Sequence, residues 1–72
     1  MSKKEKFISL AESRMQKALH MIHLVGNLSN KNNYEYTDKE VKKIITSLED
    51  AVKNVKKRFE SSSKDDMFDF KF

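Results

Sequence analysis

The stretch that decides the fold is residues 26–41, GNLSNKNNYEYTDKEV, which is polar and lies between two long amphipathic segments. Within it, Thr37 and Glu40 have the spacing of a capping box, in which each side chain accepts a hydrogen bond from the other residue's amide. Tyr36 and Val41 occupy the two positions of a hydrophobic staple around that cap. The pattern therefore predicts that a helix begins immediately after Thr37.

The segment that follows the cap, residues 38–60, carries one regular apolar stripe. Its members alternate four and three residues apart: Val41, Ile45, Leu48, Val52, Val55 and Phe59. This spacing is typical of a coiled-coil seam and does not fit the two-residue period of a strand. We expect this helix to pack its stripe against another helix.

The segment before the connector, residues 4–28, predicts a helix with a much wider apolar arc. At about 100° per residue, its apolar side chains cover more than half of the circumference. A helix in a two-helix hairpin can hide only a narrow stripe against its single neighbour. The width of the arc therefore predicts a homodimer or a higher oligomer, in which Arg14, Met21 and Leu24 are candidate interface residues.

Arg14 is the charged exception inside this arc, and two explanations stay open. Its aliphatic stem can lie along the core while its guanidinium reaches water or a glutamate. Alternatively, it forms an ion pair at an oligomer interface, because a charge buried there must find a carboxylate.

The composition favours an all-α protein. The chain has no Pro, no Cys and one Gly, so it has few turn residues and no disulfide or thiolate metal site. We predict an antiparallel two-helix hairpin, with helices about 4–28 and 38–60, that assembles into a helical bundle. The domain division is a hairpin at 1–60 and a C-terminal tail at 61–72, and the lack of a secretory signal predicts a cytoplasmic location.

The end of the first helix is less sharply marked than the start of the second. Gly26 is either a left-handed cap or part of a helix that continues to Ser29 or Asn30, and we favour the second alternative. Gly26 would then allow the second helix or Tyr34 to approach closely. A later asparagine would supply a left-handed cap, the candidates being Asn30, Asn32 and Asn33.

The order GNLSN, then NYEYT, then a capping turn before an apolar helix resembles a group of small helical proteins of bacteria and their phages and plasmids. The resemblance covers about residues 14–59 and leaves the tail out. It implies a helical fold and a bacterial or mobile-element origin, and it implies no activity, cofactor or partner.

Catalytic chemistry has little support in the sequence. His20 and His23 have a spacing compatible with two metal ligands, but no third ligand or nucleophile accompanies them, and exposed or interface histidines are the favoured explanation. The chain has no phosphate-binding glycine loop and no protease or hydrolase motif. We expect a protein that is not an enzyme and that has no cofactor and no bound metal.

A lysine face on the second helix suggests nucleic acid as an alternative partner. It comprises Lys39, Lys42, Lys43, Lys53, Lys56 and Lys57, and the formal net charge of the chain is +4. Such a face favours weak, salt-sensitive contact with a phosphate backbone, although Glu49 and Asp50 interrupt it. A face that only contacts water is the favoured explanation. The connector asparagines and tyrosines, as a site for a nucleotide-like ligand, are a less favoured alternative.

The C-terminal tail combines acidic and aromatic residues. Met67, Phe68, Phe70 and Phe72 are costly to leave in water, so the tail either covers the chain's own apolar surface, forms a short edge strand, or docks on a protein partner. The function expected from the sequence is a non-enzymatic, oligomeric interaction or inhibitor protein without membrane contact.

Overall fold

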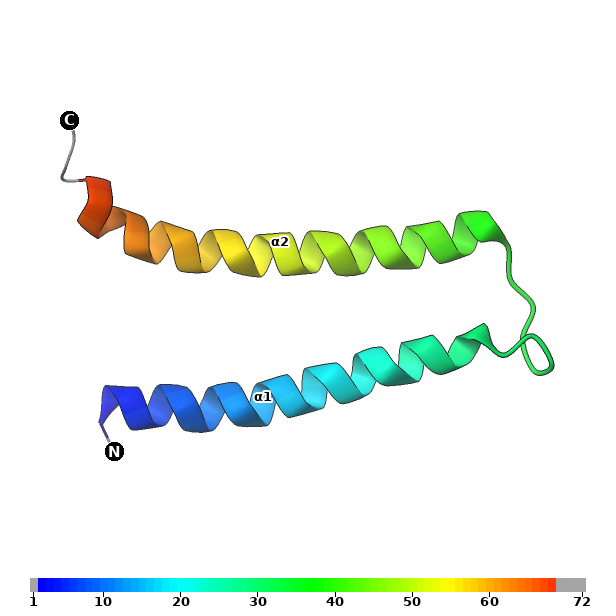
Figure 1. Cartoon of the computed structure of the whole chain (residues 1–72), viewed down its shortest axis with the longest axis horizontal. Helices are drawn as coiled ribbons and strands as arrows, with labels where there is room; N and C mark the ends of the chain where they lie inside the picture. The colour runs from blue at the N-terminus through cyan, green and yellow to red at the C-terminus, as the bar shows by residue number, and fades with distance from the viewer. Residues whose placement is uncertain (1, 69–72) are drawn as a thin grey trace. The chain divides into compact units, whose positions relative to one another are not determined.

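The computed structural model describes residues 2–68, with side chains to residue 62, and every element of regular secondary structure in this part of the chain is a helix. Helix α1 spans Lys3–Gly26, the 3-10 helix η1 spans Asn27–Ser29, and helix α2 spans Asp38–Phe68 (Figure 1). The prediction of an all-α chain with two long helices is confirmed. The chain divides into two units, Met1–Glu35 and Tyr36–Phe72, and each is described by itself.

Helix α1 begins with a capping box that we did not predict. The Ser2 hydroxyl accepts a hydrogen bond from the Glu5 amide at 3.1 Å, and the Glu5 carboxylate accepts one from the Ser2 amide at 3.0 Å. The hydrogen bond from the Ser2 amide is the main cause that lowers the pKa of Glu5 below its usual value. A hydrogen bond with the Ser2 side chain is the second cause. The signal, a serine followed three residues later by a glutamate, is the same one that identifies the second helix.

The favoured prediction that helical structure continues past Gly26 to Ser29 is confirmed, although its last turn is of a different type. The α-helix stops at Gly26, and the chain continues to Ser29 as the tighter η1 turn. Gly26 has a φ of −61° and a ψ of −30°, so it is helical and is not a left-handed cap. Asn30 is extended, with a φ of −70° and a ψ of 102°, so the proposed left-handed cap at Asn30 is wrong.

The connector after η1 folds on local hydrogen bonds. The Asn30 carbonyl accepts bonds from the amides of Asn33 at 3.1 Å and Tyr34 at 3.0 Å. Its side-chain oxygen accepts one from the Asn32 amide at 3.0 Å, which is a typical asparagine turn. The turn therefore ends the helix although Asn30 is not in the left-handed region.

The predicted cap of α2 is confirmed. The Thr37 hydroxyl accepts from the Glu40 amide at 3.1 Å, and the Glu40 carboxylate accepts from the Thr37 amide at 2.8 Å and from the Thr37 hydroxyl at 3.2 Å. Tyr36 is half-buried beside this cap, while Val41 is 38% exposed. The staple between these two side chains stays a prediction.

Helix α2 is longer than predicted, because the serine run at 61–63 does not end it. The helix continues to Phe68, so the boundary at residue 60 is wrong and the first eight residues of the predicted tail are helical. Serine is only modestly less favourable than alanine in a helix, and no Gly or Pro stands nearby to stop it. A strand that begins at Phe68 is also excluded, whereas Phe70 and Phe72 lie outside the described residues.

Gly26 offers a direct test of what lies beside the last turn of α1. A Cβ added at Gly26 would meet nothing within 4 Å, which contradicts the expected close approach of Tyr34. Because the residue is helical, Gly26→Ala should stabilise the protein by about 1 kcal/mol. Thermal unfolding followed by circular dichroism measures the change. A lower melting temperature would show that another helix packs closely against Gly26 and leaves no room for a side chain there.

Candidate interaction surfaces

Large apolar side chains remain exposed on both helices. Among residues 2–62 no side chain is buried, and only Ala11, Val25, Tyr36 and Leu48 are half-buried. The exposed large apolar side chains range from 38% exposed at Val41 to 66% exposed at Val52. Fully burying such a side chain stabilises a protein by about 1.5–3 kcal/mol, so these faces are where contact would contribute most.

Apart from Leu19, the apolar side chains in the arc of α1 fall into two seams, each with the alternating three- and four-residue spacing of a coiled coil. We call the first the uncharged seam: Ile8, Ala11, Met15, Ala18, Ile22 and Val25. We call the second the charged seam: Phe7, Leu10, Arg14, Lys17, Met21, Leu24 and Leu28. Their centres lie about 100° apart around the helix at 3.6 residues per turn. Sequence reasoning missed the two seams because it treated the arc as one surface.

The predicted interface residues Arg14, Met21 and Leu24 all belong to the charged seam. Met21 is 60% exposed, Leu24 is 43% exposed and Arg14 is exposed as well. Near the start of this seam, the Lys4 ammonium lies over the Phe7 ring, 5.8 Å from its centroid. Such an exposed cation–π contact contributes about 0.5–1 kcal/mol, and the Phe7 side chain is still 52% exposed.

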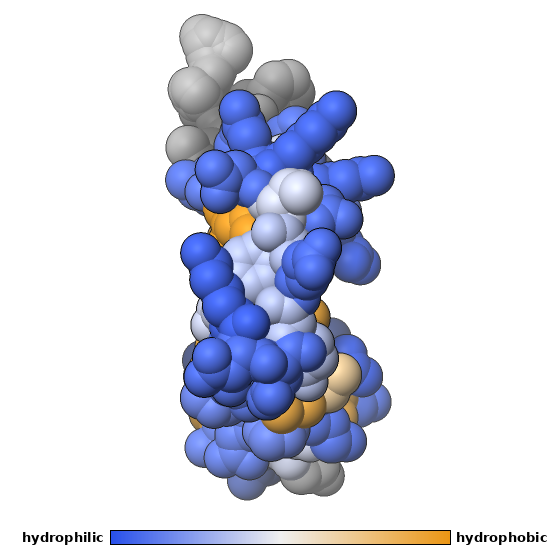
Figure 2. All heavy atoms as spheres, turned by 90° about the vertical axis from the view of Figure 1, so that its right-hand side faces the viewer, coloured by the Kyte–Doolittle hydropathy of each residue, from blue (hydrophilic) through white to orange (hydrophobic). Residues whose placement is uncertain are grey.

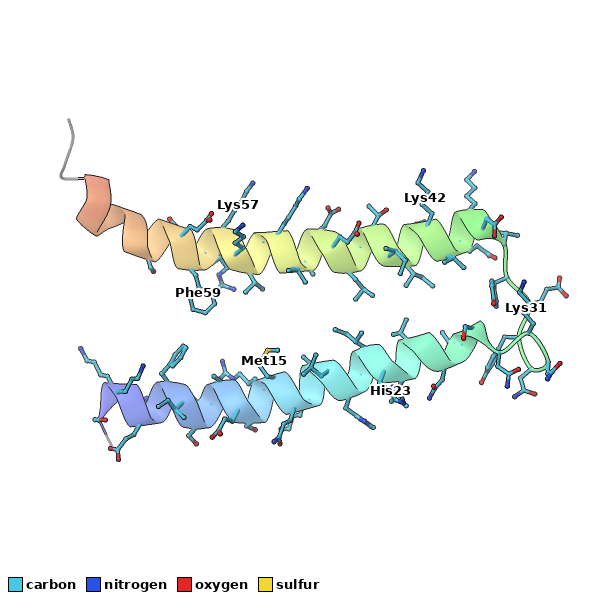
Figure 3. All side chains as sticks on the ribbon, in the orientation of Figure 1. Met15, His23, Lys31, Lys42, Lys57 and Phe59 are labelled. Atoms are coloured by element: carbon cyan, nitrogen blue, oxygen red, sulfur yellow. The ribbon has the colours of Figure 1, made fainter. Side chains whose placement is uncertain are left out.

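Helix α2 has one stripe and a distinct lysine face. In Figure 3, Phe59 points to one side of α2, whereas Lys42 and Lys57 point to the other. The six predicted lysines are all exposed. An open hollow of about 350 Å³ lies at the C-terminal end of the stripe, where it is lined by Val55, Arg58, Phe59 and Ser62. The stripe and the lysine face are therefore separate surfaces of one helix.

The polar side of α1 holds the two histidines. His23 points away from the side on which Met15 lies (Figure 3), and both His20 and His23 are exposed. Within the described part of the chain, no three His, Cys, Asp or Glu side chains are grouped so that they could hold a metal ion. The structure does not bring a third ligand to these histidines.

The connector uses its own polar groups in local bonds. Asn30 and the pair Thr37 and Glu40 are engaged in the turn and the cap described above. Figure 2, which views the chain from the connector side, shows mostly hydrophilic atoms with small apolar patches. The local hydrogen bonds of Asn30, Thr37 and Glu40 support an architectural role for the connector.

The tail residues named in the sequence analysis are only partly described. Met67 and Phe68 belong to the last turn of α2, and Phe70 and Phe72 lie outside the described residues. No helix in the described part of the chain is both long and apolar enough to cross a membrane.

Comparisons with known proteins add no relative. Protein-family models, curated proteins and solved structures give no match to this chain. The functional argument therefore rests on the surfaces themselves.

Proposed function

We propose that this chain is a non-enzymatic interaction protein that self-associates through its helix faces and acts by binding or inhibiting a protein partner. The observation that supports it is the exposure of apolar side chains along both helices with no buried side chain among residues 2–62. Contiguous apolar surface of this kind marks sites of protein contact. The antiparallel hairpin, the bacterial or mobile-element origin and the cytoplasmic location belong to the same proposal.

The wide arc of α1 supports the self-association. Helix α2 presents one stripe, whereas α1 presents two seams, so pairing α1 with α2 leaves one seam of α1 uncovered. A helix that is apolar over more than half of its surface needs two neighbours, as in a four-helix bundle.

A protein partner is tested by affinity capture with matched variants of the full chain. The tagged protein, Leu19→Asp and Ser13→Asp are each incubated with bacterial lysate, and the bound proteins are identified by mass spectrometry. Leu19 is 57% exposed on the apolar arc, whereas Ser13 lies on the polar side, and both variants add the same charge. A protein retained by the wild type and Ser13→Asp, but lost by Leu19→Asp, supports the proposal. Equal retention by all three contradicts it.

The lysine face of α2 supports a second candidate, a small nucleic-acid-binding regulator. At about 100° per residue its six lysines fall on one broad side of the helix, and all are exposed, as contact with a phosphate backbone requires. Titration of the full chain and of Lys53→Glu with duplex and single-stranded DNA, at two salt concentrations, distinguishes a nucleic-acid partner from a protein partner. Salt-sensitive binding that is lost in Lys53→Glu would favour nucleic acid over a protein partner.

A further inference from the structure

When the uncharged seam of α1 is read against itself in the opposite direction, large side chains face small ones, an alternation with alanine that the α2 stripe and the charged seam lack. With two copies antiparallel, Ile8 lies opposite Val25, Ala11 opposite Ile22, and Met15 opposite Ala18. The four inner layers each place a large side chain against an alanine. Alternation of large and small side chains across facing positions is what lets helix layers interdigitate.

We infer that the uncharged seam binds the same seam of a second copy of this chain, with the two α1 helices antiparallel. The inference rests on the proposed self-association and names its surface and its register. All six members lie within one uninterrupted α-helix. Their side chains range from half-buried to exposed, so each keeps surface that can contact a second copy.

The charged seam is a poor surface for a second copy. Lys17 stands near its midpoint, with Arg14 one turn away, so a two-fold axis through the seam would bring like charges of the two copies together. Like charges at an interface disfavour that pairing and so select against it. The uncharged seam contains no ionisable residue and carries no such penalty.

Helix α2 is the competing occupant, since its stripe could cover either seam of α1. The stripe suits the charged seam, because Glu49 stands beside the middle of the stripe and its carboxylate can balance the charges of Arg14 and Lys17. In that arrangement the stems of Arg14 and Lys17 lie along apolar surface while their charges reach water. Both seams of α1 and the stripe of α2 are then covered.

Disulfide cross-linking tests the register. Because the chain has no native Cys, only the introduced residues can form disulfides. Full-length Ala11→Cys and Ile22→Cys chains are oxidised separately and as a mixture. The antiparallel register places residue 11 beside residue 22 of the other copy. Two residues 11 are then about 16 Å apart along the axis at 1.5 Å per residue, beyond disulfide reach. We expect covalent dimers predominantly in the mixture, each containing one chain of each kind.

A matched control uses Ser9→Cys and His20→Cys, which have the same separation but lie on the polar side of α1. This mixture should cross-link no more than either variant alone. Cross-links within the Ala11→Cys or Ile22→Cys samples alone would indicate parallel helices and overturn the register. No cross-link in the mixture of a chain that sediments as a dimer would show that the copies associate through another surface or register, and would overturn the inference.

Sedimentation of Ala18→Glu and Gln16→Glu separates this inference from self-association in general. Ala18→Glu should weaken the dimer by about 100-fold or more, because the carboxylate is buried without a partner at the centre of the seam. Gln16→Glu should leave the dimer unchanged. A wild-type monomer at all concentrations overturns both the inference and the proposed self-association. A dimer that tolerates Ala18→Glu overturns only the inference.

Discussion

Dilution of the full chain should remove most of its helicity. No side chain among residues 2–62 is buried, so neither helix has a core of its own to offset the entropy of ordering its backbone. Isolated helices are marginal in water even when they are well capped, and most helical stability in proteins comes from packing. We therefore expect helix formation and association to be one coupled event.

Circular dichroism at 222 nm and the melting temperature, each followed over a concentration series, measure this coupling. A roughly hundredfold dilution removes about 2.7 kcal/mol of apparent stability from a coupled dimer, which is a large part of what a chain of this size has. Sedimentation of the same samples provides the control. Unchanged helicity and an unchanged melting temperature in a chain that sediments as a monomer would contradict the prediction.

The second large effect is expected from Leu48→Asp. Leu48 is at the centre of the α2 stripe and is the only residue from Asp38 to Ser62 that is half-buried. The change removes an apolar side chain whose full burial is worth about 1.5–3 kcal/mol. It also places a carboxylate, without a counter-charge, where the stripe packs, at a cost of about 3 kcal/mol or more. We expect loss of both the thermal transition and the dimer.

Thr46→Asp is the matched control, because Thr46 is exposed on the other side of α2 and receives the same charge. Aspartate and threonine have similar helix propensities, so this variant should unfold within about 0.5 kcal/mol of the wild type. Urea unfolding followed by circular dichroism compares the three proteins. Similar unfolding of both variants would mean that the stripe is not the packed surface of α2.

The features that the sequence predicts well are those encoded by neighbouring residues. The start of α2 depends on Thr37 and Glu40 alone, and the structure confirms both of their amide hydrogen bonds. Ser2 and Glu5 carry the same signal, so the start of α1 was equally predictable and was overlooked. Local hydrogen bonds of this kind do not depend on what the rest of the chain does.

Helix ends and surfaces are harder to predict for a physical reason. The serine run at 61–63 lowers helix propensity only slightly, so it could not stop α2 before Phe68. Several packing arrangements of the apolar seams have similar free energies. The apolar pattern of one helix therefore does not decide which surface covers each seam. Testing α1 for coiled-coil spacing, as was done for α2, would have separated the two seams that hold Met15 and Met21.

The two capping boxes also bear on how quickly this protein forms. Each helix carries its own start, at Ser2 and at Thr37, within its first four residues. The slow step in making a helix is its first turn, and a cap lowers that barrier without help from distant residues. Each helix can therefore form its first turns within microseconds, although it persists only once association packs its apolar face. Assembly of the copies, which depends on their concentration, is left as the step that sets the overall rate.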